Sequence, residues 1–195
     1  MNLNAKLTIY LALTATLAGC VTTKPVVKYG DAKAVETVTA EFGSTDLQQI
    51  GEAMTRSLLQ SRVVAGAYEP VIITMAPVKN KTRDYIDTVT ITDKIRTQLT
   101  RSGLVRFGVS ISEMQGQVDE LKRQNQTGLY AKSTQSRMGN MQGARYRLEG
   151  AISDIKKTTK DVQDVFYIFN LNLVNNETGL IEWADEKEIR KTTTR

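Results

Sequence analysis

The chain of 195 residues contains no histidine and only one cysteine, Cys20. Without an imidazole, the chain cannot assemble a Ser-His-Asp or a Cys-His catalytic site. The same two counts exclude a zinc site of thiolate and imidazole ligands and any disulfide within the chain. An enzyme built from this sequence would have to use carboxylates, lysine, serine, threonine or tyrosine alone. Most common hydrolytic and metal-dependent chemistries are therefore excluded.

Prolines (3) and aromatic residues (6%) are also few, but the rest of the composition is that of an ordinary globular protein. Hydrophobic residues make up 41% and charged residues 24%, which is enough for one domain of about 100–150 residues with appendages. The formal net charge is +5, and a positive charge of this size favours anionic partners.

The first twenty residues have the pattern of a targeting segment. Lys6 precedes an apolar run over residues 7–18, which is shorter than the roughly 20 residues that cross a bilayer and is typical of a signal peptide. The run ends in Leu-Ala-Gly-Cys at residues 17–20, which resembles the lipobox of bacterial lipoproteins. This resemblance implies that residues 1–19 are removed as a signal peptide and that Cys20 carries a covalent lipid. Val21 stands where inner-membrane lipoproteins typically carry aspartate, which implies an outer-membrane anchor with the protein on the periplasmic side.

Residues 21–41 show neither helical nor strand periodicity over a useful length. We therefore expect residues 20–41 to form the lipidated cysteine and a flexible tether, with a maximum reach of about 70 Å. The globular periplasmic domain is expected over residues 42–195.

The rest of the chain alternates between helical and strand patterns. Helices are expected over residues 44–62, 88–103 and 112–126, and strands over residues 71–76, 104–111, 144–155, 165–174 and 180–189. The helix residues expected to face the core are Leu47, Ile50, Met54, Leu58, Leu59, Val89, Ile91, Ile95 and Leu99. Residues 77–87 are expected to be a loop, residues 130–143 a polar segment that could include a further helix, and residues 156–160 a basic turn. This order predicts an α/β (α+β) fold: a single small domain with a mixed four- to five-stranded sheet and packed helices.

Three sequence patterns could suggest catalysis or phosphate binding, and each has a simpler structural explanation. Ser153 and Lys156 match the Ser-x-x-Lys pattern of penicillin-recognising enzymes, but the other elements of that mechanism are absent. Residues 139–143 lack the Gly-Lys-Ser/Thr ending of a phosphate-binding loop. The carboxylates Asp185, Glu186 and Glu188 alternate with basic residues, as on a solvated strand. We therefore expect no catalytic residue, no metal site and no cofactor besides the lipid on Cys20.

Basic residues could form a positive face. They are Lys79, Lys81, Arg83, Arg137, Arg145, Arg147, Lys156, Lys157 and Lys160. Nucleic acid is not expected as a partner in the periplasm. Acidic protein surfaces, anionic lipids and peptidoglycan carboxylates are available there, and charge assists encounter and orientation. A merely solvated surface explains the same residues equally well.

Four stretches of the sequence resemble one family. They are FGSTDLQ at residues 42–48, VKNKTRDYIDT at 78–88, ARYRLEG at 144–150 and NNETGLIEWADEKEIRK at 175–191. In this order, and after the lipobox, they resemble the LpoB-type outer-membrane lipoprotein activators of penicillin-binding proteins. The last stretch is the most specific part of the resemblance.

The resemblance implies a function in peptidoglycan synthesis. Proteins of this type bind a small docking domain of a class A penicillin-binding protein and stimulate its glycosyltransferase and, with it, its transpeptidase. The chain would then be an allosteric effector and not an enzyme, with a domain similar to the N-terminal domain of TolB. Well-known members carry a longer, often proline-rich tether than residues 21–41 provide.

We expect the partner to bind a loop, because exposed arginine and tyrosine side chains are the usual anchors of interfaces. The predicted loop residues are Lys79, Asn80, Lys81, Arg83 and Tyr85, and a second patch is expected at Arg137, Arg145 and Arg147. An ordinary polar loop is the alternative interpretation. Two other functions stay open at this point: an envelope-assembly subunit of the curli-export type, and a peptidoglycan-modifying enzyme with paired carboxylates.

Overall fold

The computed structural model describes residues 27–194, and its larger compact unit is Ala32–Arg195. The helices are α2 (Ser44–Gln60), α3 (Arg62–Ala65), α4 (Thr88–Arg101) and α5 (Ile111–Gln126). The strands are β1 (Val71–Met75), β2 (Lys79–Asn80), β3 (Val105–Phe107), β4 (Tyr146–Thr158), β5 (Val162–Asn175) and β6 (Ile181–Thr194). No helix in residues 27–194 has the length and apolar character that a membrane crossing requires.

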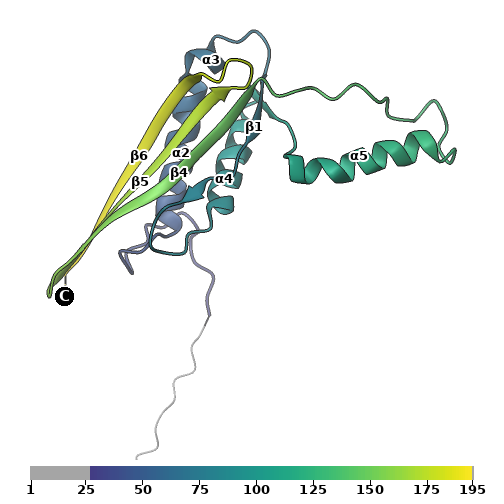
Figure 1. Cartoon of the computed structure of the whole chain (residues 1–195). Coiled ribbons are helices and arrows are strands. Elements are labelled where there is room, and N and C mark those ends of the chain that lie inside the picture. Colours follow the sequence, from purple (N-terminus) through teal and green to yellow (C-terminus); the bar gives the residue numbers. More distant parts are fainter. Residues whose placement is uncertain (1–26, 195) are drawn as a thin grey trace, which may run out of the picture. The chain divides into compact units, whose positions relative to one another are not determined.

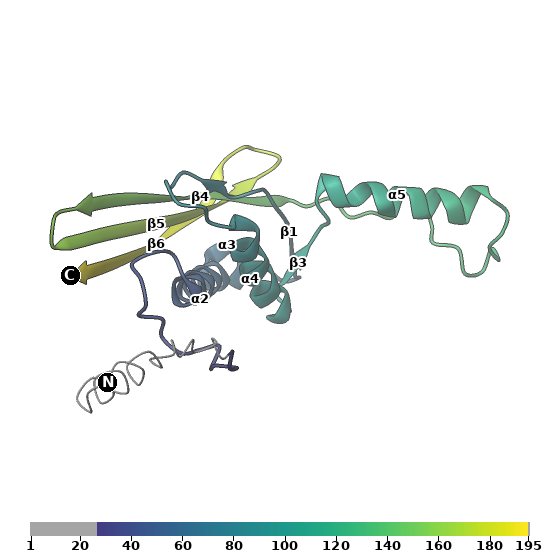
Figure 2. The ribbon, with the colours of Figure 1, turned by 90° about the horizontal axis from the view of Figure 1, so that it is seen from below.

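The strands form one mixed sheet in the order β3-β1-β4-β5-β6, and the short β2 pairs beside β4. β1 runs parallel to both β3 and β4, whereas β4, β5 and β6 form an antiparallel meander. Helices α2, α3 and α4 all lie on the same face of this sheet (Figures 1 and 2). The predicted α+β fold class with a mixed sheet is therefore confirmed, and β2 raises the number of strands to six.

The core lies between that sheet face and the helices. β5 alternates in burial along its length, so that Tyr167, Phe169 and Leu171 point into the core and the residues between them point to the opposite face. Ile50 of α2 and Ile91 of α4, each fully buried, pack onto these side chains as part of one cluster. Apolar residues at helical spacing in α2 and α4 and at alternating positions in β5 thus enclose a single core.

Aspartate side chains accept hydrogen bonds from backbone amides at the start of both core helices. Gly43 is the N-cap of α2, and Asp46 accepts a hydrogen bond from the Gly43 N–H at 2.8 Å. Asp87 is the N-cap of α4 and accepts from the Val89 N–H at 3.0 Å. Val89 was expected to face the core, but it is 63% exposed. This prediction is wrong because Val89 lies two residues, or about 200°, from the inward-facing Ile91 on the helix.

The compact unit begins at Ala32, ten residues before the predicted start. The Glu36 N–H donates to the Thr45 hydroxyl at 2.7 Å, and a Glu36 carboxylate oxygen accepts from the Ser44 N–H at 2.8 Å. Ala40 is 6% exposed and belongs to the core cluster. Residues 32–41 therefore pack onto the start of α2 through contacts that no periodicity in their own sequence indicates.

The antiparallel strands are longer than predicted. Lys156 and Lys157 were expected in a turn, but they belong to β4 and pair with Val165 and Asp164 of β5. The strand at residues 104–111 is shorter than predicted, because only residues 105–107 pair with β1. Residues 130–143 form turns and irregular structure and no helix. For the strands, the pairing partner, and not the local pattern, sets the length of the element.

Candidate functional site

The predicted docking loop begins as part of the sheet. Lys79 and Asn80 pair with Ala151 and Ile152 of β4, and the Lys81 N–H donates to the Ile152 carbonyl at 2.8 Å. All five predicted loop residues are exposed, namely Lys79, Asn80, Lys81, Arg83 and Tyr85. Tyr85 is 95% exposed. The structure thus brings the whole predicted set together on one surface loop.

Hydrogen bonds within the loop hold its backbone in one conformation. The Asn80 Oδ1 accepts from the Thr82 N–H at 2.9 Å, and the Asn80 amide donates to the Asp84 carbonyl at 3.0 Å. The Thr82 hydroxyl lies 2.7 Å from Asn80 Oδ1 and 2.9 Å from the Asp84 carbonyl, so its single proton goes to one of them. An ordered loop loses less conformational entropy on binding a partner than a disordered one does.

The Asp84 side chain anchors the loop to the sheet. Its Oδ2 lies 3.4 Å from the hydroxyl of Tyr167, and its Oδ1 lies 3.9 Å from Lys156 Nζ. Tyr167 is 1% exposed, and its ring meets the Phe42 ring edge-on at 5.8 Å. Burial, and then the neighbouring Asp84 carboxylate, raise the pKa of Tyr167 above its ordinary value, so the hydroxyl keeps its proton as a donor. The exposed Arg83 and Tyr85 therefore flank an anchored residue.

The predicted second patch divides between two places. Arg145 stacks its guanidinium over the Tyr146 ring at 5.6 Å, and Arg147 forms an ion pair with Glu149 at 3.1 Å. Arg147 lies near the start of β4, roughly 13 Å along the strand from Ala151, which pairs with Lys79, and Arg145 directly precedes the strand. Arg137 instead lines a polar hollow beside α5, together with Glu120. In the unbound chain, the positive charge of Arg147 is thus partly balanced by the carboxylate of Glu149.

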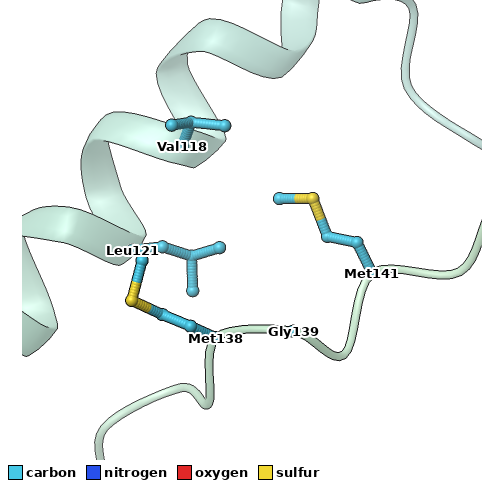
Figure 3. Close-up of a pocket in the computed structure, with 5 residues that line it drawn as sticks. All are labelled: Val118, Leu121, Met138, Gly139 and Met141. Atoms are coloured by element: carbon cyan, nitrogen blue, oxygen red, sulfur yellow. The ribbon is translucent and has the colours of Figure 1, made fainter.

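An apolar pocket between α5 and the segment after it was not expected. Val118 and Leu121 of α5 face Met138, Gly139 and Met141 across a pocket of about 270 Å³ (Figure 3). The spacing of Val118 and Leu121 is the helical i, i+3 repeat, which could have indicated an apolar stripe on this otherwise polar helix. The pocket lining has no group that could act as an acid, a base or a nucleophile.

The patterns that could suggest catalysis are separated by the fold. Ser153 and Lys156 lie three residues apart on β4, so their side chains point to opposite faces of the sheet, and Lys156 pairs with Asp84. Asp185 and Glu186 point to opposite faces of β6 for the same reason. Within residues 27–194, no group of three or more acidic, cysteine or histidine residues is placed to hold a metal ion. Cys20 lies outside the described residues, and its lipidation stays a prediction.

A family model described as the peptidoglycan-synthase activator LpoB matches residues 46–189. The matched region covers nearly three quarters of the chain, from the first turn of α2 to the buried Ile189 of β6, and includes the loop at residues 79–85. The chain belongs to this family of peptidoglycan-synthase activators. An activator regulates the reaction of another protein, so membership of the family supports a regulatory role.

Several solved structures are similar to this chain. The LpoB C-terminal domain from Salmonella enterica is 17% identical, with a TM-score of 0.45, over 75% of this chain and 99% of that one. The solution structure of LpoB from Escherichia coli is 16% identical, with a TM-score of 0.42, over 90% and 87%. Lipoprotein GNA1162 from Neisseria meningitidis is 17% identical, with a TM-score of 0.41, over 64% and 85%. No curated protein matches the chain significantly, and the family assignment therefore rests on the family model.

Proposed function

We propose that this LpoB-family chain is an outer-membrane lipoprotein, anchored through a lipid on Cys20, that binds a class A penicillin-binding protein. Binding would stimulate the glycosyltransferase of that synthase and, with it, the transpeptidase. Family membership supports the activator role. The lipobox-like sequence that ends at Cys20, followed by Val21, supports the outer-membrane anchor.

The observation that carries the proposal is the ordered, exposed loop at residues 79–85. Tyr85 is 95% exposed on a loop whose backbone is held by Asn80 and whose centre is tied to the sheet through Asp84. Exposed tyrosine and arginine side chains supply much of the binding energy of interfaces. A partner that buries Arg83 and Tyr85 gains this contact area at little cost in ordering the loop.

The proposed mechanism is allosteric and needs no reacting group from this chain. A ligand shifts a conformational equilibrium only by the difference in its affinity for the two states. The chain must therefore bind the active conformation of the synthase more tightly than the resting one. A tenfold stimulation corresponds to a difference of about 1.4 kcal/mol between the two binding free energies, which one well-buried tyrosine or arginine contact can supply.

The length of chain between the proposed anchor and the domain limits how far from the outer membrane the domain can bind the synthase. The compact unit begins at Ala32, so that residues 21–31 are left between the proposed lipid anchor and the domain. At about 3.5 Å per residue, they span at most about 40 Å. The domain itself must therefore contribute to the reach, and a synthase that binds this chain must extend far enough from the inner membrane.

The test uses the unit Ala32–Arg195 and each class A penicillin-binding protein of the source organism, with glycan polymerisation and cross-linking followed from lipid-linked precursor. We expect one synthase to be accelerated, with saturation at increasing concentration of the unit. Arg83→Ala and Tyr85→Ala should each raise the half-maximal concentration by about tenfold or more. The exposed Arg101 and Tyr68 provide matched control substitutions to alanine, which should leave it unchanged.

The outcomes separate the activator role from its site. If no class A synthase binds or responds, the proposed partner class is wrong. If the wild-type unit activates and the Arg83 and Tyr85 variants behave like the controls, the role stands and the loop is not the docking site; Arg145→Ala then tests the second patch. Mass spectrometry of the protein extracted from outer membranes tests the lipid on Cys20, and an unmodified Cys20 would contradict the anchor.

A further inference from the structure

The sheet face opposite the helices is open in the described part of the chain. Helices α2, α3 and α4 lie on the other face (Figure 2), and the core side chains of β5 point towards them. Because side chains alternate along a strand, Phe166, Ile168 and Asn170 of β5 point to the open face. We call this surface the outer face.

The strand register arranges the outer face in rows that run from β2 or β4 across to β6. Residues paired directly across an antiparallel ladder share one face of the sheet. The three central rows are Lys79, Ala151, Asn170 and Glu186; Ser153, Ile168 and Glu188; and Ile155, Phe166 and Arg190. By alternation, Lys81 continues the second row on the side of β2.

Charge on this face is divided between its two edges. Lys79 and Lys81 lie on the β2 side, and Glu186 and Glu188 lie on the β6 side, about 14 Å away across three strand spacings. All four side chains are exposed, and within residues 27–194 none of them is in an ion pair. By contrast, Arg190 is paired with Asp164 at 2.9 Å.

The strip between the charged edges contains the apolar side chains of Ala151, Ile155, Phe166 and Ile168, together with the polar Ser153 and Asn170. Ile155 is 53% exposed and pairs with Phe166, and Ile168 lies beside them in the next row. In its first two rows this strip is bounded by lysines on one side and by glutamates on the other, and the third row ends at Arg190, which is paired with Asp164. The strip is therefore complementary to itself. Two copies can face each other with the apolar strips in contact and with each basic edge over an acidic edge.

We propose that the outer face binds the outer face of a second copy of this chain, around a two-fold axis parallel to the strands and between β4 and β5. This axis exchanges the two edges, so that Lys79 and Lys81 of each copy meet Glu186 and Glu188 of the other. It also places Ile155 against the partner's Phe166. A two-fold axis across the strands would bring lysines onto lysines, so charge selects the first arrangement.

The size of the face indicates that the dimer is weak. Four strands of about 4.8 Å spacing and the three rows of about 6.8 Å give a contact of roughly 400 Å² on each copy. The total of about 800 Å² is in the range of weak, transient contacts and below that of stable specific interfaces. We therefore expect dissociation in the micromolar range and a further loss of affinity with added salt, since the charged edges are solvent-exposed.

The experiment exchanges the charges of one edge at a time in the full chain. One variant carries Lys79→Glu and Lys81→Glu, and the other carries Glu186→Lys and Glu188→Lys. Mass is measured by sedimentation equilibrium in a density-matched detergent, over about 10 µM to 1 mM, the range expected for an interface of this size. We expect the wild type to dimerise, each variant alone to dissociate at least tenfold more readily, and an equimolar mixture of the two variants to recover the dimer.

A control variant makes the same change of charge elsewhere. Lys122→Glu with Lys132→Glu alters two exposed lysines outside the outer face and should leave the dimer unchanged. Ile155→Asn should weaken the dimer while the folded content stays the same, because Ile155 is more than half exposed. A wild type that stays monomeric, edge variants that dimerise like the wild type, or a mixture that fails to recover association would each overturn the proposal.

Discussion

Lys191 and Asp46 form a buried ion pair that joins the end of β6 to the start of α2. The Lys191 Nζ lies 2.9 Å from Asp46 Oδ2, with side-chain exposures of 15% and 3%. The ammonium also donates to the Glu41 carbonyl at 2.6 Å. The same carboxylate oxygen accepts the Gly43 N–H at 2.8 Å. The pair thus connects the last strand, the first turn of a core helix and the segment before it.

Lys191→Met is expected to lower the free energy of unfolding by about 3 kcal/mol. Methionine keeps the packing of the lysine stem, but it leaves a buried carboxylate without its cation, which costs about 3–5 kcal/mol. The retained bond from Gly43 places the loss at the lower end of that range. Asp46→Asn should cost about 1–2 kcal/mol, because the more exposed ammonium of Lys191 can turn towards water. Each single variant leaves one charge without its partner, whereas the double variant removes both charges. We therefore expect a coupling energy of about 1–3 kcal/mol between the two substitutions.

The single tryptophan is well placed to report this change. Trp183 lies in β6 and donates to the Ser57 hydroxyl of α2 at 3.3 Å, so its fluorescence follows the separation of β6 from α2 during urea unfolding. Arg123→Met serves as the control, because its ion pair with Glu120 is exposed and exposed pairs contribute little to stability. A loss below about 1 kcal/mol for Lys191→Met, or additive effects in the double variant, would refute the reasoning from burial.

Three further outcomes are expected. Gly150→Ala places a Cβ against a backbone carbonyl of β5 and should lower stability by about 2 kcal/mol or more in thermal unfolding, whereas Gly143→Ala, with open space around it, should not. The Arg190 guanidinium lowers the pKa of Asp164. The ionised Asp164 therefore stabilises the folded state at pH values above its unfolded pKa of about 3.9, and this stabilisation is lost as the pH falls through the lower folded pKa. An Asp164 pKa that stays low in Arg190→Met, measured by NMR titration, would contradict this cause. Ser110→Ala removes the N-cap side chain of α5, which should speed amide hydrogen exchange in that helix. The melting temperature should stay nearly constant, because the core cluster contains no α5 residue.

The loop at residues 79–85 shows how far the sequence could indicate the candidate site. Its polar composition predicted an exposed loop, and Tyr85 and Arg83 are exposed as expected. The contact that anchors the loop was not predictable, because the Asp84 carboxylate meets the hydroxyl of Tyr167, 83 residues further along the chain. A hydrogen bond across such a distance depends on the register of β4 and β5, which short sequence patterns do not specify.

The sequence by itself determined the features that depend on local periodicity and on composition. The inward positions of Ile91, Ile95 and Leu99 follow from the helical repeat, and the hairpin of β5 and β6 follows from two strand patterns around a turn. The absence of histidine excludes whole classes of catalytic site through composition alone. These features are accessible because each depends on neighbouring residues or on counts alone.

Only the tertiary structure decided which distant residues meet. It placed Lys191 on Asp46, 145 residues apart, and drew residues 32–41 into the domain through Ala40. It also arranged lysines and glutamates from separate strands at opposite edges of one sheet face. The physical reason is that pairing across a sheet fixes register and face together: a slip of one residue would reverse every side chain of a strand, and only burial of the whole core selects the register.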